Sequence, residues 1–144
     1  MATVEQILMV KGPDVIVAAP TSTVLEAARL MAEANVGSVI VRQAGEVLGI
    51  FTERDLLQRV VADGKDPSSV LLADVMTSPV KSCRLSDDLQ ACARELSAGH
   101  IRHLAVVEED ALVGLIGLRD ILSAQLRSRE DEVEALRSGS GAPA

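Results

Sequence analysis

The sequence has almost no aromatic residues: Phe51 is its only phenylalanine, and it contains neither tryptophan nor tyrosine. Proteins that bind single-stranded nucleic acid commonly stack the bases on aromatic side chains, and this chain lacks such surfaces. Basic residues are also in the minority, since 14 Lys and Arg against 21 Asp and Glu give a net charge of −7. Because non-specific binding to nucleic acid depends on neutralising phosphates with Lys and Arg, we expect no nucleic-acid partner.

Cysteines and long apolar runs are scarce too. Cys83 and Cys92 are the two cysteines, too few for a disulfide framework and typical of a reducing compartment. No apolar run approaches the roughly 20 residues of a membrane span, and the N-terminal stretch MATVEQILMVKG has no signal-peptide pattern. We therefore expect a cytoplasmic protein with no membrane partner. The 48% of hydrophobic residues are enough for a sizeable core.

The chain contains an internal repeat. Residues 15–57 align without a gap with residues 80–122, at an offset of 65 positions. The agreement is densest where GIFTERDLL (49–57) meets GLIGLRDIL (114–122), because both follow the frame G, apolar, apolar, any, any, R, D, any, L. The copies differ inside this frame, where Thr52 of the first corresponds to Gly117 of the second. We infer that the chain is a duplicated half-domain whose two copies are not equivalent.

The apolar pattern predicts that each copy folds as strand, helix, strand, strand, helix. One copy alone is too small to cover its own sheet, so we expect an α+β fold whose two repeats pack as a pseudo-two-fold pair. We assign residues 1–65 to the first repeat, 66–125 to the second, and 126–144 to a charged helical extension with a disordered tail. The expected boundary signals are helix N-caps at Thr21 or Ser22 and at Ser86 and Asp87, helix ends at Asn35 or Gly37 and at Gly99, a turn at Ala44 and Gly45, and a second helix from Thr52 to near Gly64.

The segment TERD within the frame has two interpretations. In the first, Thr52 caps a helix and Asp55 completes a capping box three residues later, which requires no ligand. In the second, the Asp55 carboxylate accepts hydrogen bonds from two vicinal hydroxyls of a ribose, where one charge-assisted bond is worth roughly 1.5 to 3 kcal/mol. Spacing alone leaves both interpretations open.

Several stretches together resemble the cystathionine-β-synthase (CBS) domain: the repeated frame, TSTVLEAARLMAEANVGSVIV, DVMTSP and HIRHLAVVE. From Val4 to Leu122 the chain resembles a stand-alone CBS pair, or Bateman module. The ribose-binding signature of that family is G, apolar, any, Ser or Thr, any, any, Asp, which matches at Gly49, Thr52 and Asp55. The resemblance implies tandem βαββα repeats that bind AMP, ADP, ATP, NAD or S-adenosylmethionine in a cleft between them. It also implies a homodimer of such pairs.

The resemblance implies further site residues. Because Gly117 lacks the hydroxyl, Asp120 is expected to form only a weak second site. Plain structural alternatives exist for the predicted basic residues: Arg102 can pair with Glu108, His103 can be a half-buried histidine, and Arg54 can form a structural ion pair. The remaining implied roles are phosphate binding for Arg102, His103 and Arg54, and a base pocket formed by Ser78, Val80 and Ile101.

We expect neither a metal site nor catalysis. Cys83 aligns with Ala18 and Cys92 with Ala27, which suggests two small core residues, and no CxxC or HxxxH spacing is present. No nucleophile stands near a base, and no phosphate-binding loop is found. The sequence thus predicts a regulatory sensor that needs no cofactor, binds an adenosyl ligand and signals to an unknown effector protein. The alternatives are a ligand-independent interaction or dimerisation module and, less in keeping with the composition, a nucleic-acid-binding regulator.

Overall fold

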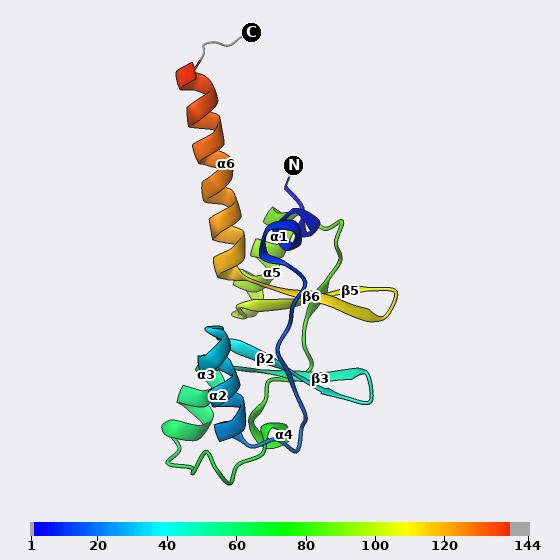
Figure 1. The fold of residues 1–144 in the computed structure, drawn as a ribbon, viewed down its shortest axis with the longest axis vertical. Helices are drawn as coiled ribbons and strands as arrows, with labels where there is room; N and C mark the ends of the chain where they lie inside the picture. Colours follow the sequence, from blue (N-terminus) through cyan, green and yellow to red (C-terminus); the bar gives the residue numbers. More distant parts are fainter. Residues whose placement is uncertain (1, 139–144) are drawn as a thin grey trace. The chain divides into compact units, whose positions relative to one another are not determined.

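The structure is a computed structural model that describes residues 2–138, drawn as a ribbon in Figure 1. It confirms the predicted α+β fold, because each repeat contributes its own three-stranded sheet and helices. Among residues 2–138, no helix combines the length and the apolar character required to cross a membrane.

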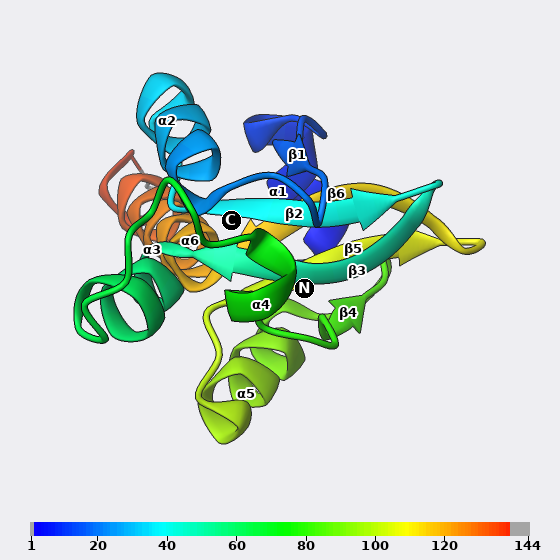
Figure 2. The same cartoon turned by 90° about the horizontal axis from the view of Figure 1, so that it is seen from below.

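The first repeat forms a sheet with the strand order β1–β2–β3, in which β1 pairs parallel with β2 and β2 pairs antiparallel with β3. The side chain of Phe51 is completely buried in the core beneath this sheet. The segment around α4 pairs with β3, and Figure 2 shows α4 across that strand. The elements are β1 (Val17–Ala18), α2 (Val24–Ala34), β2 (Ser38–Gln43), β3 (Glu46–Thr52), α3 (Glu53–Asp55), the π-helical η1 (Leu56–Val61) and α4 (Leu72–Val75).

The second repeat has the same topology, with the strand order β4–β5–β6. Its last helix is much longer than its counterpart in the first repeat, as the sequence predicted for the charged extension. The predicted tail after it, residues 139–144, lies outside the described residues. The elements are α1 (Val4–Lys11), β4 (Ser82–Cys83), α5 (Leu89–Gly99), β5 (His103–Glu108), β6 (Ala111–Gly117) and α6 (Leu118–Ser138).

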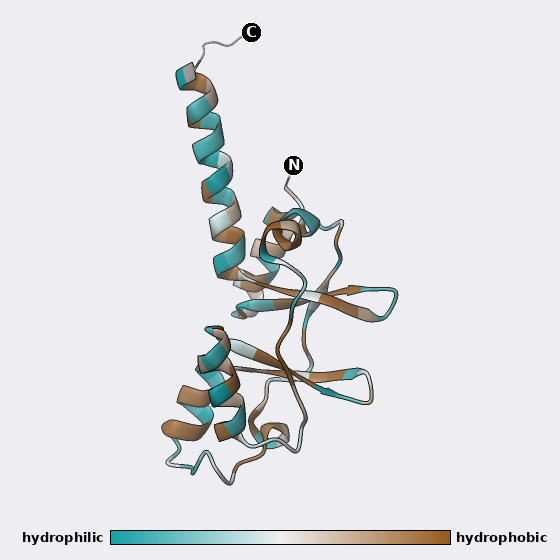
Figure 3. Ribbon diagram, in the orientation of Figure 1, coloured by the Kyte–Doolittle hydropathy of each residue, from teal (hydrophilic) through white to brown (hydrophobic). Residues whose placement is uncertain are grey.

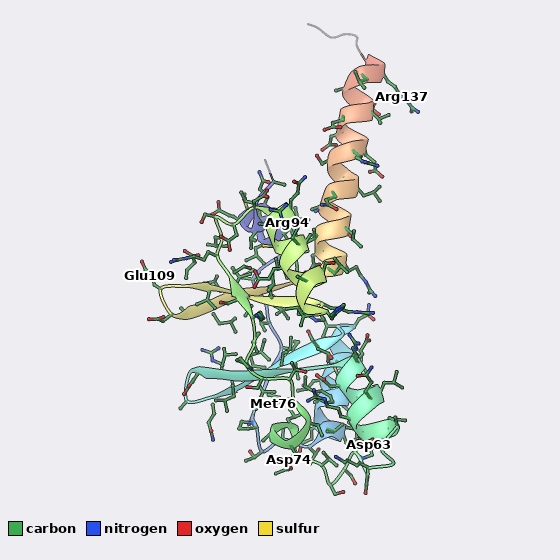
Figure 4. The ribbon with its side chains drawn as sticks, turned by 180° about the vertical axis from the view of Figure 1, so that it is seen from behind. Asp63, Asp74, Met76, Arg94, Glu109 and Arg137 are labelled. Carbon is green, nitrogen blue, oxygen red and sulfur yellow. The ribbon has the colours of Figure 1, made fainter. Side chains whose placement is uncertain are left out.

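The backbone repeats the 65-residue offset position by position. Left-handed residues end the first helix of each copy, at Asn35 and His100, and the hairpin turn at Ala44 and Gly45 has its counterpart at Glu109 and Asp110. Figure 4 labels Glu109 at the tip of the β5–β6 hairpin. Each hairpin also carries a bulge, at positions 41/42 and 106/107. The duplication is therefore a property of the backbone as well as of the sequence.

The N-cap residues of α2 and α5 lie one or two positions later in the chain than the sequence predicted. Thr23, not Thr21 or Ser22, caps α2, because it forms a reciprocal capping box with Glu26. Asp88, not Ser86 or Asp87, caps α5 and accepts a hydrogen bond from the backbone N–H of Ala91. The Thr-x-x-Glu spacing of Thr23 and Glu26 was the signal that the sequence prediction passed over.

The compact units of the structure do not coincide with residues 1–65 and 66–125. One unit comprises residues 14–81, and the other joins the described residues up to Pro13 to those from Ser82 onward. Helix α1 belongs to the core of the second sheet, where Val4 and Ile7 are buried. Helix α4 contributes Leu72 to the core of the first sheet. Each sheet is thus packed with the helix that leads into the other repeat.

The close packing of these segments explains why glycine occupies the two aligned positions 49 and 114. A Cβ atom on Gly49 would come within 2.7 Å of both the Met76 sulfur and the Thr77 carbonyl oxygen. A Cβ atom on Gly114 would come within 2.8 Å of the Leu8 side-chain tip. The atoms that a Cβ at Gly49 would meet include the backbone carbonyl of Thr77, which cannot move easily. A Cβ at Gly114 would meet only the end of the Leu8 side chain, which can change rotamer.

We therefore expect Gly49→Ala to destabilise the protein more than Gly114→Ala. The first substitution should lower the free energy of unfolding by about 1 to 3 kcal/mol and the second by less than about 1 kcal/mol. Both variants restrict the unfolded chain in the same way, so their difference isolates the native contact. Urea denaturation measures it, and equal losses would contradict the assignment of Gly49 to the backbone contact with Thr77.

Candidate ligand site

The predicted capping box is present at the start of the second helix of the first repeat. The backbone N–H of Thr52 donates to Asp55 Oδ2 at 3.0 Å, and the Thr52 hydroxyl donates to the same oxygen at 3.1 Å. In return, the Asp55 N–H donates to Thr52 Oγ1 at 3.2 Å. The Asp55 side chain is 8% exposed. The structural interpretation of TERD is therefore confirmed for this carboxylate.

Two residues that the sequence prediction did not include in the site also hold Asp55. The Thr77 hydroxyl donates to Asp55 Oδ1 at 2.9 Å. Arg59 places its Nε atom 3.7 Å from the same oxygen, and its Nη1 donates to the carbonyl of Met76 at 3.0 Å. The sequence contained signals for both: Arg59 is four residues after Asp55 on a helix, and Thr77 belongs to the family-like stretch DVMTSP. Figure 4 labels Met76 beside α4.

In the second repeat, the aligned carboxylate of Asp120 accepts from other donors than Asp55 does. The backbone N–H of Gly117 donates to Asp120 Oδ2 at 2.8 Å, so half of the capping box survives without the hydroxyl. The Lys11 ammonium, at the end of α1, also lies 2.8 Å from Asp120 Oδ2 and donates to the carbonyl of Leu115 at 2.7 Å. The weak-site residue Asp120 is thus ion-paired to the protein's own lysine.

Lys11 takes the place of Thr77 in the two hydrogen bonds that Thr77 donates. In the first repeat, Thr77 donates its N–H to the carbonyl of Ile50 and its O–H to Asp55. At the aligned positions of the second repeat, the Lys11 ammonium donates to both Leu115 and Asp120. The donor bonded to the motif acid is therefore a neutral hydroxyl in the first repeat, with the Arg59 cation 3.7 Å away, and an ammonium at 2.8 Å in the second.

The remaining predicted residues divide between the two units. Arg54 and Ser78 lie exposed in the unit of residues 14–81, where the Ser78 hydroxyl donates to the carbonyl of Leu48 at 2.7 Å. Val80 is half-buried in the same unit. Arg102, His103 and Ile101 belong to the other unit, so their convergence with Thr52 and Asp55 stays a prediction.

The structure gives Glu108 a partner other than Arg102. Arg84 lies 3.7 Å from Glu108 Oε2, and the N–H of Leu85 donates to the same oxygen. The suggested ion pair between Arg102 and Glu108 is therefore wrong. Arg102 is exposed, and His103 is half-buried with its ring against Gly117.

A separate shallow groove of about 410 Å³ lies between β1 and α2. Its lining includes Ser22, Glu26 and Arg29 but none of the predicted site residues. The groove is wide open and is lined by β1, α2 and the loop between them, away from the ribose motif, so we assign it no role in ligand binding.

The comparisons with known proteins agree with this architecture. The family profile of the CBS domain matches the chain twice, over residues 4–62 and 72–127. The chain belongs to the CBS-domain family. Among curated relatives, the uncharacterized protein MK0525 of Methanopyrus kandleri is 37% identical over 114 residues, which cover 78% of this chain and 58% of that protein. The CBS domain-containing protein YhcV of Bacillus subtilis is 32% identical over 117 residues, covering 81% of this chain and 82% of YhcV.

Solved structures are similar over nearly the whole module. The CBS-domain containing protein ATU1752 from Agrobacterium tumefaciens has a TM-score of 0.82 at 33% identity, covering 86% of this chain and 99% of that one. The CBS domain protein PAE2072 from Pyrobaculum aerophilum, solved in complex with AMP, has a TM-score of 0.73 at 25% identity, covering 88% and 99%. A hexameric CBS-CP12 protein from bloom-forming cyanobacteria has a TM-score of 0.79 at 26% identity, covering 96% and 83%. Family and fold are thereby confirmed. With MK0525 and mitochondrial CBSX3 of Arabidopsis thaliana, however, the chain spans less than two thirds of the relative's length.

Proposed function

We propose that this chain is a regulatory CBS pair that binds one adenosyl ligand, such as AMP, ADP, ATP, NAD or S-adenosylmethionine, through the ribose motif of its first repeat. The observation that carries the proposal is the difference between the two motif acids: Asp55 accepts a hydrogen bond from the Thr77 hydroxyl and has Arg59 only at 3.7 Å, whereas Asp120 is bonded directly to the Lys11 ammonium at 2.8 Å. The AMP complex of PAE2072 supports an adenosyl ligand. In this proposal Arg102, His103 and Arg54 meet the phosphates, and Ser78, Val80 and Ile101 meet the base.

The hydrogen bonds at Asp55 leave room for one more donor. An ionised carboxylate has about four acceptor positions, and Asp55 uses three of them, for the Thr52 N–H, the Thr52 hydroxyl and the Thr77 hydroxyl. A first ribose hydroxyl can therefore add to Oδ1 without breaking a hydrogen bond, because the other neighbour of this oxygen, Arg59, is an ion-pair partner at 3.7 Å. The second hydroxyl of the diol takes the place of Thr77, which exchanges one neutral donor for another.

The same exchange is unfavourable at Asp120. A ribose hydroxyl there has to displace the Lys11 ammonium, which also leaves the Leu115 carbonyl without its donor. Both bonds are charge-assisted because the carboxylate is ionised, but only the ammonium brings an opposite charge to it, so the replacement loses Coulomb attraction. We expect one binding event per chain.

Displacement of the Thr77 hydroxyl from Asp55 would allow ligand binding to change the structure. Thr77, with Arg59, ties the segment after α4 to Asp55, so a ligand that displaces the hydroxyl weakens the attachment of that segment. The ligand then favours the state with the loosened segment, which is how a population shift arises. The effector protein that receives the signal is not identified, and we propose that it acts in the cytoplasm. We propose no catalytic role and no required cofactor.

We expect Asp55→Asn to reduce the affinity for the adenosyl ligand at least tenfold, because the neutral amide loses the charge-assisted bonds to the ribose. Asp120→Asn is the matched control and should change the affinity by less than twofold. Isothermal titration against AMP, ADP, ATP, NAD and S-adenosylmethionine measures both. Equal losses in the two variants would refute the single-site assignment.

A designed second site gives an independent prediction. Gly117→Thr alone should leave the stoichiometry at one, because Lys11 still holds Asp120 and a new Cβ atom would lie 3.2 Å from the His103 ring. Adding Lys11→Met to Gly117→Thr removes the competing cation and should raise the stoichiometry toward two. If Gly117→Thr alone creates the second site, Lys11 is not the obstacle. The control Lys81→Met removes an exposed lysine from the other unit.

Exposed apolar residues support the expected self-association of the module. Leu57 and Val61 of η1 are 61% and 58% exposed, and their aligned residues in α6, Leu122 and Leu126, are 56% and 60% exposed. Within α6, Leu122, Leu126 and Val133 form an apolar stripe at helical spacing, and Figure 3 shows brown bands on the outer part of this helix. We propose that a second copy covers these positions in a homodimer; the hexameric neighbour is an assembly of another size.

The double variant Leu122→Glu/Leu126→Glu should convert the oligomer to a monomer, because each copy would bury two carboxylates against the other. The control Met9→Glu changes an even more exposed apolar residue, which lies on α1 outside the stripe, and should leave the mass unchanged. Light scattering after size exclusion measures the mass. An unaltered oligomer in the double variant would contradict this interface.

A ligand-independent interaction module is the second candidate function. It is favoured by one observation: the capping box, Thr77 and Arg59 account for the burial of Asp55 without any ligand. The two candidates differ in a thermal-shift measurement with millimolar ligand, because only a ligand that binds the native state raises the melting temperature. No shift with any of the five adenosyl compounds would favour the interaction module.

A further inference from the structure

A second group of polar side chains lies in the second repeat, apart from Asp120. Cys83 of β4, Cys92 of α5 and Asp87 of the loop between these elements bring their ligand atoms within 4.8 Å of one another. Both thiols are buried and unoxidised, whereas Asp87 is half-buried and reaches the surface. This group was missed by the search for CxxC and HxxxH spacings, because its members are brought together by the strand, the loop and the helix.

The first repeat is an internal control for the role of these residues. At the aligned positions it carries Ala18 and Ala27, which are 7% and 0% exposed, while Cys83 and Cys92 are 4% and 2% exposed. The same fold therefore fills these two core positions with methyl groups. Packing explains a small residue at each position, but it does not explain two thiols facing a carboxylate.

The electrostatics of the group disfavour thiolates in the absence of a cation. Burial, followed by the neighbouring Cys92 and Asp87, raises the pKa of the Cys83 thiol to about 12. Burial and then Asp87 also raise the pKa of Cys92. A divalent cation reverses this balance, because it attracts the same negative charges that otherwise repel one another.

We propose that Cys83, Cys92 and Asp87 bind a thiophilic divalent cation of the zinc class. The ion takes the two thiolate sulfurs and one carboxylate oxygen, the two thiol protons leave to solvent, and water fills the fourth position. Tetrahedral coordination with zinc–sulfur bonds of about 2.3 Å and a zinc–oxygen bond of about 2.0 Å separates the sulfurs by about 3.8 Å and each sulfur from the oxygen by about 3.5 Å. Because the ligand atoms already lie within 4.8 Å of one another, each pair needs to close by no more than about 1 to 1.3 Å. The Asp87 carboxylate is already oriented, because its Oδ2 accepts a hydrogen bond from the N–H of Arg84 at 2.9 Å.

Further acids surround the group. Glu95 acts on both thiols with its negative charge, and Asp88 acts on Cys92. A bound divalent cation would offset this negative charge and stabilise both thiolates at once.

The test uses the full chain, fully reduced and treated with a chelator, titrated with Co²⁺ and then with Zn²⁺. We expect one cobalt per chain, a sulfur-to-cobalt charge-transfer band that zinc abolishes, and a higher melting temperature with zinc. Cys83→Ala/Cys92→Ala copies the residues of the first repeat, so it should fold and lose the band. Asp87→Asn should weaken zinc binding about tenfold or more, and the control Asp74→Asn, in α4, should not change it.

Two results would overturn the proposal. The first is the absence of a charge-transfer band in reduced protein whose two thiols are both titratable after unfolding. The second is a band that persists in the double alanine variant, since the metal then has other ligands. Circular dichroism of each variant separates loss of the site from loss of the fold.

Discussion

The carboxylate of Asp55 holds three parts of the first unit together: the end of β3, the first turn of α3 and the segment after α4. A buried carboxylate is costly unless donors surround it, and here Thr52 and Thr77 provide them, with Arg59 nearby. The close approach of that segment also requires Gly49, since a Cβ atom there would meet the Thr77 carbonyl. Capping, packing and the proposed ribose site therefore depend on one side chain.

The second unit shows what happens when one donor of this network changes. With Gly117 in place of the threonine, the cap keeps only the backbone bond to Asp120, and Lys11 fills the space of the lost donors. Asp120 therefore needs no ligand as a partner, because the Lys11 ammonium already pairs with it. Duplication thus produced two copies of one backbone. In the first copy the motif acid is bonded to the neutral Thr77 hydroxyl, which a ribose hydroxyl would replace in the proposed function. The same asymmetry recurs at Cys83 and Cys92, where the second copy carries thiols and the first carries alanines.

The packing of each sheet with the helix that leads into the other repeat has a mechanical consequence. Helix α1 and the segment around α4 are held by short hydrogen bonds at their ends, from Val4 to Asp87 and from Leu72 to Ser22. Any event at Asp55 that displaces Thr77 acts directly on the segment that connects the two units. In the proposed regulatory function, the ribose contact and the segment that leads into the other unit would share the hydrogen bond from Thr77 to Asp55.

The sequence by itself determined the duplication, the strand and helix order, the turn at Ala44 and Gly45 and the capping box of Thr52 and Asp55, because all of these depend on local spacing and periodicity. It also singled out Gly117 as the point where the copies differ. Only the tertiary structure decided that Lys11 neutralises Asp120, that Thr77 and Arg59 hold Asp55, and that two cysteines meet Asp87. Lys11 and Asp120 are 109 positions apart. The burial of α1 on the second sheet brings them together, and no local pattern encodes that contact.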